Sequence, residues 1–401
     1  MPTTTTTATT TELPAEIAPP PNATGAILVE GSDGSVLLVD PALGTRETIH
    51  VGDGDGSVVQ ATGSDTGNAV VWSMSSGDDN VGLWLDGESS EFEAPFVPFF
   101  FAFSPDESQI AMLGNEESEV GLAVLDLEAG VIESVDRGAP YYLDWHGESS
   151  LLGVHIGGEF AGTVDLDGRR AAIEGSAGAY LAPDWLDHRR LLTVVRPGDV
   201  VARAGPELVV LGTDSGGTLA AVDVESGRTE RLRDVIGPVA FQATPDGGAV
   251  AYVEAETRDA ASPVGPLSVL VLDGEGGPVV VSQGPVVAFE WSPSGDQLLF
   301  LLADVESGLL APHVWDGSEE KGFEGYVPTP VFFRQYLPFW DQFSRSLTTW
   351  SPAGDAFVYA ALGEDGGEVW VQLLDGGRRK VADGEFASWI GTGQGGGAVV
   401  P

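Results

Sequence analysis

The five histidines are the first candidates for catalysis or metal binding. They are scattered along the chain, at His50, His146, His155, His188 and His313. No two have the i, i+4 spacing of a helical zinc motif. His155 and His313 fall within apolar runs typical of strands, so we expect both to be ordinary strand residues. The histidine pattern therefore predicts no catalytic or metal site.

Other catalytic signatures are missing from the sequence. The chain contains no cysteine, which excludes thiol nucleophiles, thiolate metal sites and disulfides. It also contains no G-x-S-x-G pentapeptide, the nucleophile turn of serine hydrolases. We predict no catalytic residues and no cofactor.

Acidic turns raise the possibility of calcium. The two best candidates are Asp53 and Asp55 in GDGDGS and the turn Asp78-Asp79-Asn80. Calcium takes about six to eight oxygen ligands, and neither segment has a twelve-residue calcium loop with its terminal glutamate. We interpret both segments as solvated turns.

One segment, residues 318–347, is far more aromatic than any other connection and carries arginines in a chain with few cations. Aromatic and arginine side chains on a loop are typical anchors of recognition surfaces. The candidate ligand- or partner-binding residues are Arg334, Tyr336, Phe339, Trp340, Asp341, Gln342 and Arg345. The alternative is that the segment folds onto a sheet edge, or plugs a channel, and buries its aromatic side chains as a small core.

The charge balance restricts the partners. The chain has 61 acidic and 18 basic residues, a formal net charge of -43. Phosphate binding needs a clustered basic patch, so we expect neither nucleic acid nor an anionic membrane surface as a partner. No apolar run reaches the roughly 18 residues that a membrane-spanning helix needs. We predict a monomer that binds an unknown protein or small ligand.

These candidate residues are set in a repeated β pattern, whose first mark is an apolar strand that ends in aspartate before a glycine-containing turn. An aspartate carboxylate can bond the backbone two residues further on, and glycine supplies the positive φ of a tight turn. The mark occurs eight times, at Asp40, Asp86, Asp126, Asp165, Asp223, Asp273, Asp316 and Asp375.

The second mark is an aromatic or small residue, then Ser-Pro or Thr-Pro, a polar turn and an apolar strand. The clear copies are Ser104-Pro105-Asp106, Thr244-Pro245-Asp246, Ser292-Pro293 and Ser351-Pro352. On these residues the chain resembles the TolB-type propellers, over most of residues 26–401. The resemblance implies the fold but no ligand, because members of that family bind diverse partners and some are accessory domains of peptidases.

The two marks together predict an all-β chain that forms a single β-propeller of about eight four-stranded blades, with seven as the alternative. The first aspartate strand, at Asp40, has no Ser-Pro mark before it, and the last anchor, Ser388-Trp389, has no aspartate strand after it. We therefore expect a closing blade built from both ends of the chain. Residues 1–25, rich in Thr and Pro, are predicted to be a disordered linker, and residues 26–401 to be the propeller domain with its insertion at 318–347.

The sequence favours a non-enzymatic propeller that binds a ligand or protein as a scaffold at the cell envelope. We expect an extracytoplasmic location, secreted or surface-anchored, because the Thr/Pro-rich arm is typical of a stalk. The alternative is a calcium-dependent enzyme of lactonase-like or lyase-like activity with its site in the central channel. That alternative requires at least three Asp, Glu, Asn or His side chains to converge on one point.

Overall fold

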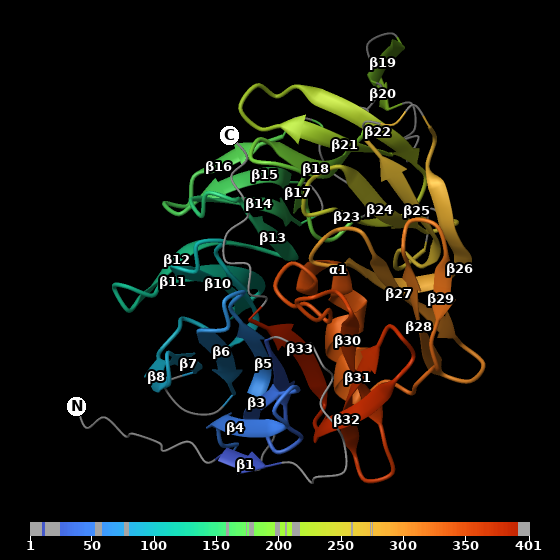
Figure 1. Cartoon of the computed structure of the whole chain (residues 1–401). Helices are drawn as coiled ribbons and strands as arrows, with labels where there is room; N and C mark the ends of the chain where they lie inside the picture. The colour runs from blue at the N-terminus through green and yellow to red at the C-terminus, as the bar shows by residue number, and fades with distance from the viewer. Residues whose placement is uncertain are drawn as a thin grey trace. The chain divides into compact units, whose positions relative to one another are not determined.

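The computed structural model describes residues 10–12, 25–52, 58–75, 80–157, 160–173, 175, 180–196, 201–204, 207–210, 217–257, 260–272, 274 and 276–391. Almost all regular structure in these ranges is β-strand, arranged in antiparallel sheets, half of which are four-stranded (Figure 1). The chain divides into two units, Met1–Arg137 with Ala288–Pro401 and Gly138–Val287. Each unit is described by itself.

Blade 1, in the first unit, joins the two ends of the described chain. It comprises β33 (Phe386–Ile390), β2 (Ala26–Glu30), β3 (Val36–Asp40) and β4 (Thr45–His50). The register of β2 on β33 runs from Ala26 opposite Ile390 to Glu30 opposite Phe386. This pairing confirms the predicted composite blade.

The other blades of the first unit repeat the same order of strands. Blade 2 comprises β5 (Val58–Gly63), β6 (Ala69–Met74), β7 (Val81–Leu85) and β8 (Glu88–Phe92). Blade 3 comprises β9 (Pro98–Phe103), β10 (Gln109–Glu116), β11 (Glu119–Asp126) and β12 (Val131–Gly138). Blade 7 comprises the second half of β26 (Val279–Trp291), β27 (Leu298–Asp304), β28 (Leu309–Trp315) and β29 (Glu320–Gly322). Blade 8 comprises β30 (Ala356–Leu362), β31 (Gly367–Leu373) and β32 (Arg378–Asp383), and its first strand is reduced to the bridge of Trp350 with Phe357.

The second unit holds blades 4, 5 and 6. Blade 4 comprises β13 (Tyr141–Trp145), β14 (Leu151–Ile156), β15 (Phe160–Asp165) and β16 (Arg170–Ala172). Blade 5 comprises β17 (Asp184–Trp185), β18 (Arg190–Val195), β21 (Gly217–Asp223) and β22 (Thr229–Val235), with the hairpin of β19 (Val201–Ala204) and β20 (Glu207–Val210) between its second and third strands. Blade 6 comprises β23 (Val239–Ala243), β24 (Ala249–Glu254), β25 (Gly265–Val271) and the first half of β26. The sheets thus count as eight blades, and the predicted propeller class is confirmed.

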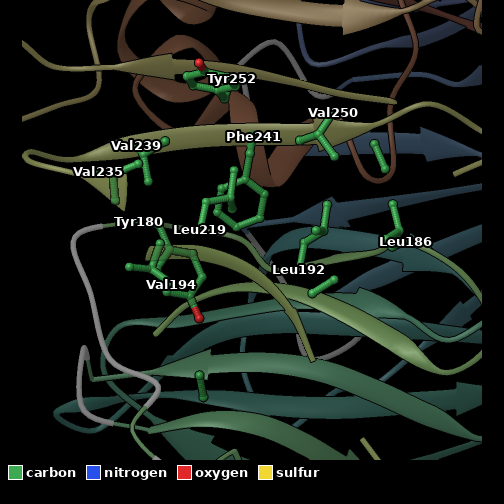
Figure 2. Packing of buried hydrophobic residues seen from close by; sticks show 13 residues of the cluster. Tyr180, Leu186, Leu192, Val194, Leu219, Val235, Val239, Phe241, Val250 and Tyr252 are labelled. Atoms are coloured by element: carbon green, nitrogen blue, oxygen red, sulfur yellow. The ribbon is translucent and has the colours of Figure 1, made fainter. Parts of the chain in front are cut away.

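The core lies between neighbouring sheets because the inner strands, such as β6 and β14, are buried along nearly their whole length and send apolar side chains to both faces. Figure 2 shows the cluster of the second unit, where Phe241 of β23 packs among Leu192, Leu219 and Val250. In the described part of the first unit, clusters of the same kind are likewise formed by side chains from more than one sheet. Packing rather than cross-linking holds the blades together, as expected for a chain without cysteine.

The aspartate turns form as predicted. The Oδ1 atom of Asp40 accepts hydrogen bonds from the backbone N–H groups of Ala42 and Leu43, both at 2.8 Å. Asp165 and Asp223 end the third strands of their blades and accept equivalent bonds. The aspartates that accept such bonds, among them Asp126, Asp316 and Asp375, therefore have structural roles in these turns, while Asp273 lies outside the described residues.

The Ser-Pro turns also share one geometry. Ser104 donates from Oγ to Asp106 at 2.7 Å and accepts from the N–H of Gln109 at 3.0 Å. Thr244 and Ser351 use their hydroxyls in the same way. In these blades the hydroxyl residue fixes the turn between the first and second strands.

The structure adds one element within the segment predicted to be a linker. Residues Thr10–Glu12 form β1, which pairs with the outer edge of β4, with Thr10 opposite Glu47. The rest of residues 1–24 lies outside the described residues.

Candidate functional site

The aromatic segment forms the only helical structure among the described residues. Its three short helical pieces follow one another directly: a π-helix (η1, Phe332–Tyr336), a 3₁₀-helix (η2, Leu337–Phe339) and one turn of α-helix (α1, Trp340–Phe343). Figure 1 shows α1 close to β30 and β33. Because residues 320–322 belong to β29, we use the name insertion for residues 323–347 only.

One face of the insertion is buried at helical spacing. Its members are Thr329, Phe332, Tyr336, Trp340, Phe343 and Leu347, all at most 7% exposed. Successive members are three or four residues apart, which places them on one side of a helix. The buried face is therefore an apolar stripe that packs on the blades.

Tyr336 is the centre of this buried face. It is fully buried, and its ring stacks on Phe386 of β33 with centroids 3.7 Å apart and planes 8° apart. Its hydroxyl donates a hydrogen bond to Oε1 of Glu30 at 2.6 Å. The N–H of Ala61 in β5 donates to the same oxygen at 2.7 Å. One buried carboxyl thus joins the insertion to blades 1 and 2.

Burial sets the protonation of this pair. Removal of the Glu30 carboxyl from water raises its pKa from 4.5 to about 7, although both hydrogen bonds act in the opposite direction. Burial and the neighbouring carboxyl also raise the pKa of Tyr336 well above its ordinary value. Glu30 consequently titrates near neutral pH, whereas Tyr336 stays protonated.

A second buried carboxyl, that of Glu290 in β26, holds the end of the segment that follows the insertion. Its Oε1 accepts from Oγ1 of Thr348 at 2.5 Å and from the N–H of Thr349 at 3.1 Å, and its Oε2 accepts from Oγ1 of Thr349 at 2.8 Å. The indole of Trp350 donates to the Glu290 backbone carbonyl at 3.1 Å. Burial raises the pKa of Glu290 to about 7.

Further contacts extend to blades 2 and 3. The side-chain amide of Gln335 donates to the backbone carbonyl of Val59, and the ring of Phe343 lies 5.6 Å from that of Phe100 in β9. The insertion follows blade 7 in the sequence, yet its contacts reach blades 1, 2 and 3 of the same unit. Its position is fixed by long-range packing.

The other side of the insertion faces solvent and is aromatic. The chain has 17 Phe, 10 Trp and 7 Tyr residues, all within the described ranges. Among them, only Phe333 (57%) and Phe339 (44%) are exposed, and both lie in the insertion. Arg334 and Pro338 are exposed beside them. We call Phe333, Arg334, Pro338 and Phe339 the outer surface of the insertion.

The seven predicted site residues divide between these two sides. Exposed residues are Arg334 and Phe339, and half-buried residues are Asp341 and Arg345. Buried residues are Tyr336, Trp340 and Gln342, at 0%, 5% and 4% exposure. The two sequence interpretations thus describe opposite faces: the buried side chains form a small core, and the exposed ones form a surface that a partner could reach.

A hollow lies between the insertion and blades 7 and 8. It is lined by Phe332, Trp340, Tyr326, Tyr359, Phe386 and Glu290, among others. With the open solvent at its mouth it spans about 480 Å³, but the space that water molecules can occupy is only about 30 Å³. A cavity of that size holds roughly two or three water molecules. The hollow is therefore a packing gap beneath the insertion.

The metal-dependent alternative requires a cluster of metal-ligating side chains. In the described ranges, no group of three or more His, Asp or Glu side chains is placed to hold a metal ion. The calcium candidates Asp53, Asp55, Asp78 and Asp79 lie outside the described residues. His155 is buried, and its ring stacks on Tyr180 with centroids 4.1 Å apart.

Sequence reasoning missed Glu30, Glu290 and Phe333. A signal for Glu290 was present, because an acidic residue directly precedes the aromatic anchor in Glu290-Trp291 and likewise in Asp184-Trp185. The Asp184 carboxylate also reaches the next blade, where it accepts from the N–H of Ala243 at 2.6 Å. An acidic residue inside an apolar first strand thus indicates a contact between blades.

Comparison with known proteins gives a fold and no family. No family model matches the chain, and no curated protein matches it. Among solved structures, oligogalacturonate lyase from Vibrio parahaemolyticus matches with a TM-score of 0.50 at 12% identity, over 82% of this chain and 85% of the lyase. TolB from Acinetobacter baumannii matches at 0.42 and 13% identity, over 91% of this chain and 66% of TolB. The β-propeller domain of the Trilobed protease from Pyrococcus furiosus matches at 0.48 and 14% identity, over 82% and 95%.

These likenesses concern the fold, which scaffolds and enzymes share. In the described part of the chain, no helix has the length and apolar character needed to cross a membrane.

Proposed function

We propose that this protein is a non-enzymatic binding scaffold and that the outer surface of the insertion is its docking site. The single observation that carries the proposal is the exposure of two phenylalanines in a chain whose other aromatic side chains are all at least partly buried. Exposed aromatic side chains next to an arginine are typical centres of protein–protein interfaces.

The surface is also rigidly supported. The buried face of the insertion packs on several blades, so the outer side chains project from a fixed backbone and lose little conformational entropy on binding. Arg334 makes no ion pair with any described residue, and its charge is available to a carboxylate or backbone carbonyl of a partner. We propose a protein partner that offers apolar side chains beside an acidic group.

We further propose that the scaffold acts outside the cytoplasm, secreted or attached at the cell envelope. The Thr/Pro-rich arm of residues 1–25 supports this location, because such a stalk holds a domain away from a surface. Fractionation of the source cells tests the location: recovery in the cytoplasmic fraction alone would contradict it.

Affinity capture from the envelope fraction tests the docking site. The wild-type protein should capture a defined partner in a constant ratio, and the variant Phe333→Ala/Arg334→Ala/Phe339→Ala should lose roughly thirtyfold or more in affinity, as expected for residues at the centre of an interface. The matched control is Leu43→Ala, a side chain that is 76% exposed in another turn of the same unit. Equal capture by the triple variant and the control would refute the docking site.

A further inference from the structure

The two buried carboxyls lie where the insertion is attached. Glu30 accepts a hydrogen bond from the hydroxyl of Tyr336 in the middle of the insertion, and Glu290 accepts hydrogen bonds from Thr348 and Thr349, the two residues directly after its end. No described cation forms an ion pair with either carboxyl. Each carboxyl is therefore held by neutral donors alone.

Neutral donors can bond the carbonyl oxygen of a protonated carboxyl, although their bonds to the ionised form are stronger. If Glu30 carries a proton on Oε2, its Oε1 still accepts from Tyr336 and Ala61. If Glu290 carries a proton on Oε2, that group donates to Oγ1 of Thr349, whose hydroxyl rotates to accept. Ionisation leaves the hydrogen bonds possible but places an uncompensated charge in a buried site, which is strongly unfavourable.

We propose that Glu30 and Glu290 form a pH-sensitive latch that holds the insertion against blades 1, 2 and 7 in acidic solution and releases it in alkaline solution. This inference rests on the proposed function, because the latch controls the presentation of the outer surface. When the insertion lifts, water reaches both carboxylates and relieves the cost of their burial.

The other titratable groups near the latch do not counteract this response. Tyr336 faces Glu30 from η1, and Glu385 donates its backbone N–H to the Glu30 carbonyl at 2.7 Å. On the side of Glu290, Tyr326 and Tyr359 line the same hollow, and Arg378 pairs with Glu324 at 3.0 Å. The pKa of each of these tyrosines is raised, so all three stay neutral between pH 6 and pH 8.

The size of the response follows from the two titrations. Each carboxyl has a pKa of about 7 in the latched state and 4.5 in water. Raising the pH from 6 to 8 then favours release by about tenfold per carboxyl and about hundredfold for both.

Hydrogen–deuterium exchange of the full chain at pH 6 and pH 8, corrected for intrinsic exchange, tests the latch. Amides of residues 329–347 should lose about hundredfold in protection relative to those of β10 (Gln109–Glu116) in the same unit. The variants Glu30→Gln and Glu290→Gln should each leave about a tenfold response, and the double variant none. The exposed-acid control Glu93→Gln should respond like the wild type.

Three results would overturn the latch: pH-independent protection in the wild type, an equal loss of protection in β10, or a wild-type response in the glutamine variants. If those variants fail to fold, Tyr336→Phe replaces them. It removes a hydrogen bond that lowers the pKa of Glu30, so the response should exceed that of the wild type, and an unchanged response would count against the latch.

The exchange experiment tests the latch and the capture experiment tests the docking site, so either proposal can fail without the other. A normal exchange response with undiminished capture by the Phe333/Arg334/Phe339 variant refutes the docking site and keeps the latch. Lost capture by that variant with a pH-independent exchange refutes the latch and keeps the docking site.

Discussion

Substitutions at Tyr336 test whether the insertion is an integral part of the core. The side chain is fully buried, stacked on Phe386 and bonded to Glu30. Tyr336→Ala removes the ring and leaves a cavity, which should lower the free energy of unfolding by roughly 3–5 kcal/mol. Tyr336→Phe keeps the ring and removes only the hydroxyl, so it should lower that free energy by about 1–3 kcal/mol.

The two substitutions should differ in their dependence on pH. The hydroxyl of Tyr336 stabilises the ionised form of Glu30, because a hydrogen bond to a charged acceptor is stronger than one to a neutral acceptor. Tyr336→Phe should therefore lower the free energy of unfolding by about 1 kcal/mol at pH 5 and by about 3 kcal/mol at pH 8. The difference reflects the pKa of about 7 for Glu30.

Urea-induced unfolding at both pH values measures these changes. The midpoint should shift while the dependence of the free energy on urea concentration stays constant between variants. The control is Phe333→Ala, three residues earlier and 57% exposed, which should change the free energy of unfolding by less than about 0.5 kcal/mol. Equal effects of Tyr336→Ala and Phe333→Ala would show that the insertion is not packed as described.

Three further predictions follow from the same structure. Gly82→Ala places a methyl group 2.1 Å from the buried ring of Trp72 and should destabilise the fold by about 1–3 kcal/mol in urea unfolding, whereas Gly147→Ala, with no atom within 4 Å, should be neutral. The free energy of unfolding should fall as the pH rises from 4.5 through 7, by roughly 3 kcal/mol for each of Glu30 and Glu290. The reason is that the folded state binds more protons in this pH range than the unfolded state, whose carboxyls titrate at 4.5. A flat profile between pH 5 and pH 8 would contradict this prediction. Addition of EDTA should leave the melting temperature unchanged, and a drop of many degrees would reveal a structural metal.

The sequence by itself determined the blades, because their signals are local. An aspartate that ends a strand bonds the backbone two or three residues later, as Asp40 does, and Ser104 bonds within its own turn. Such contacts depend only on neighbouring residue types, so eight copies predicted eight blades. The composite blade could also be predicted from the sequence, because each chain end carries only one of the two marks.

Only the tertiary structure decided which side of the insertion is buried and which is exposed. Tyr336 and Phe333 are both aromatic and three residues apart, yet one is fully buried and the other is 57% exposed. Their difference depends on contacts such as that of Tyr336 with Glu30, 306 residues away in the sequence. No local pattern encodes such a contact, since the free energy of burial depends on which distant side chains the fold brings together. Burial of Glu30 by the tertiary fold, against the effect of its hydrogen bond with Tyr336, raises the pKa of that carboxyl to about 7.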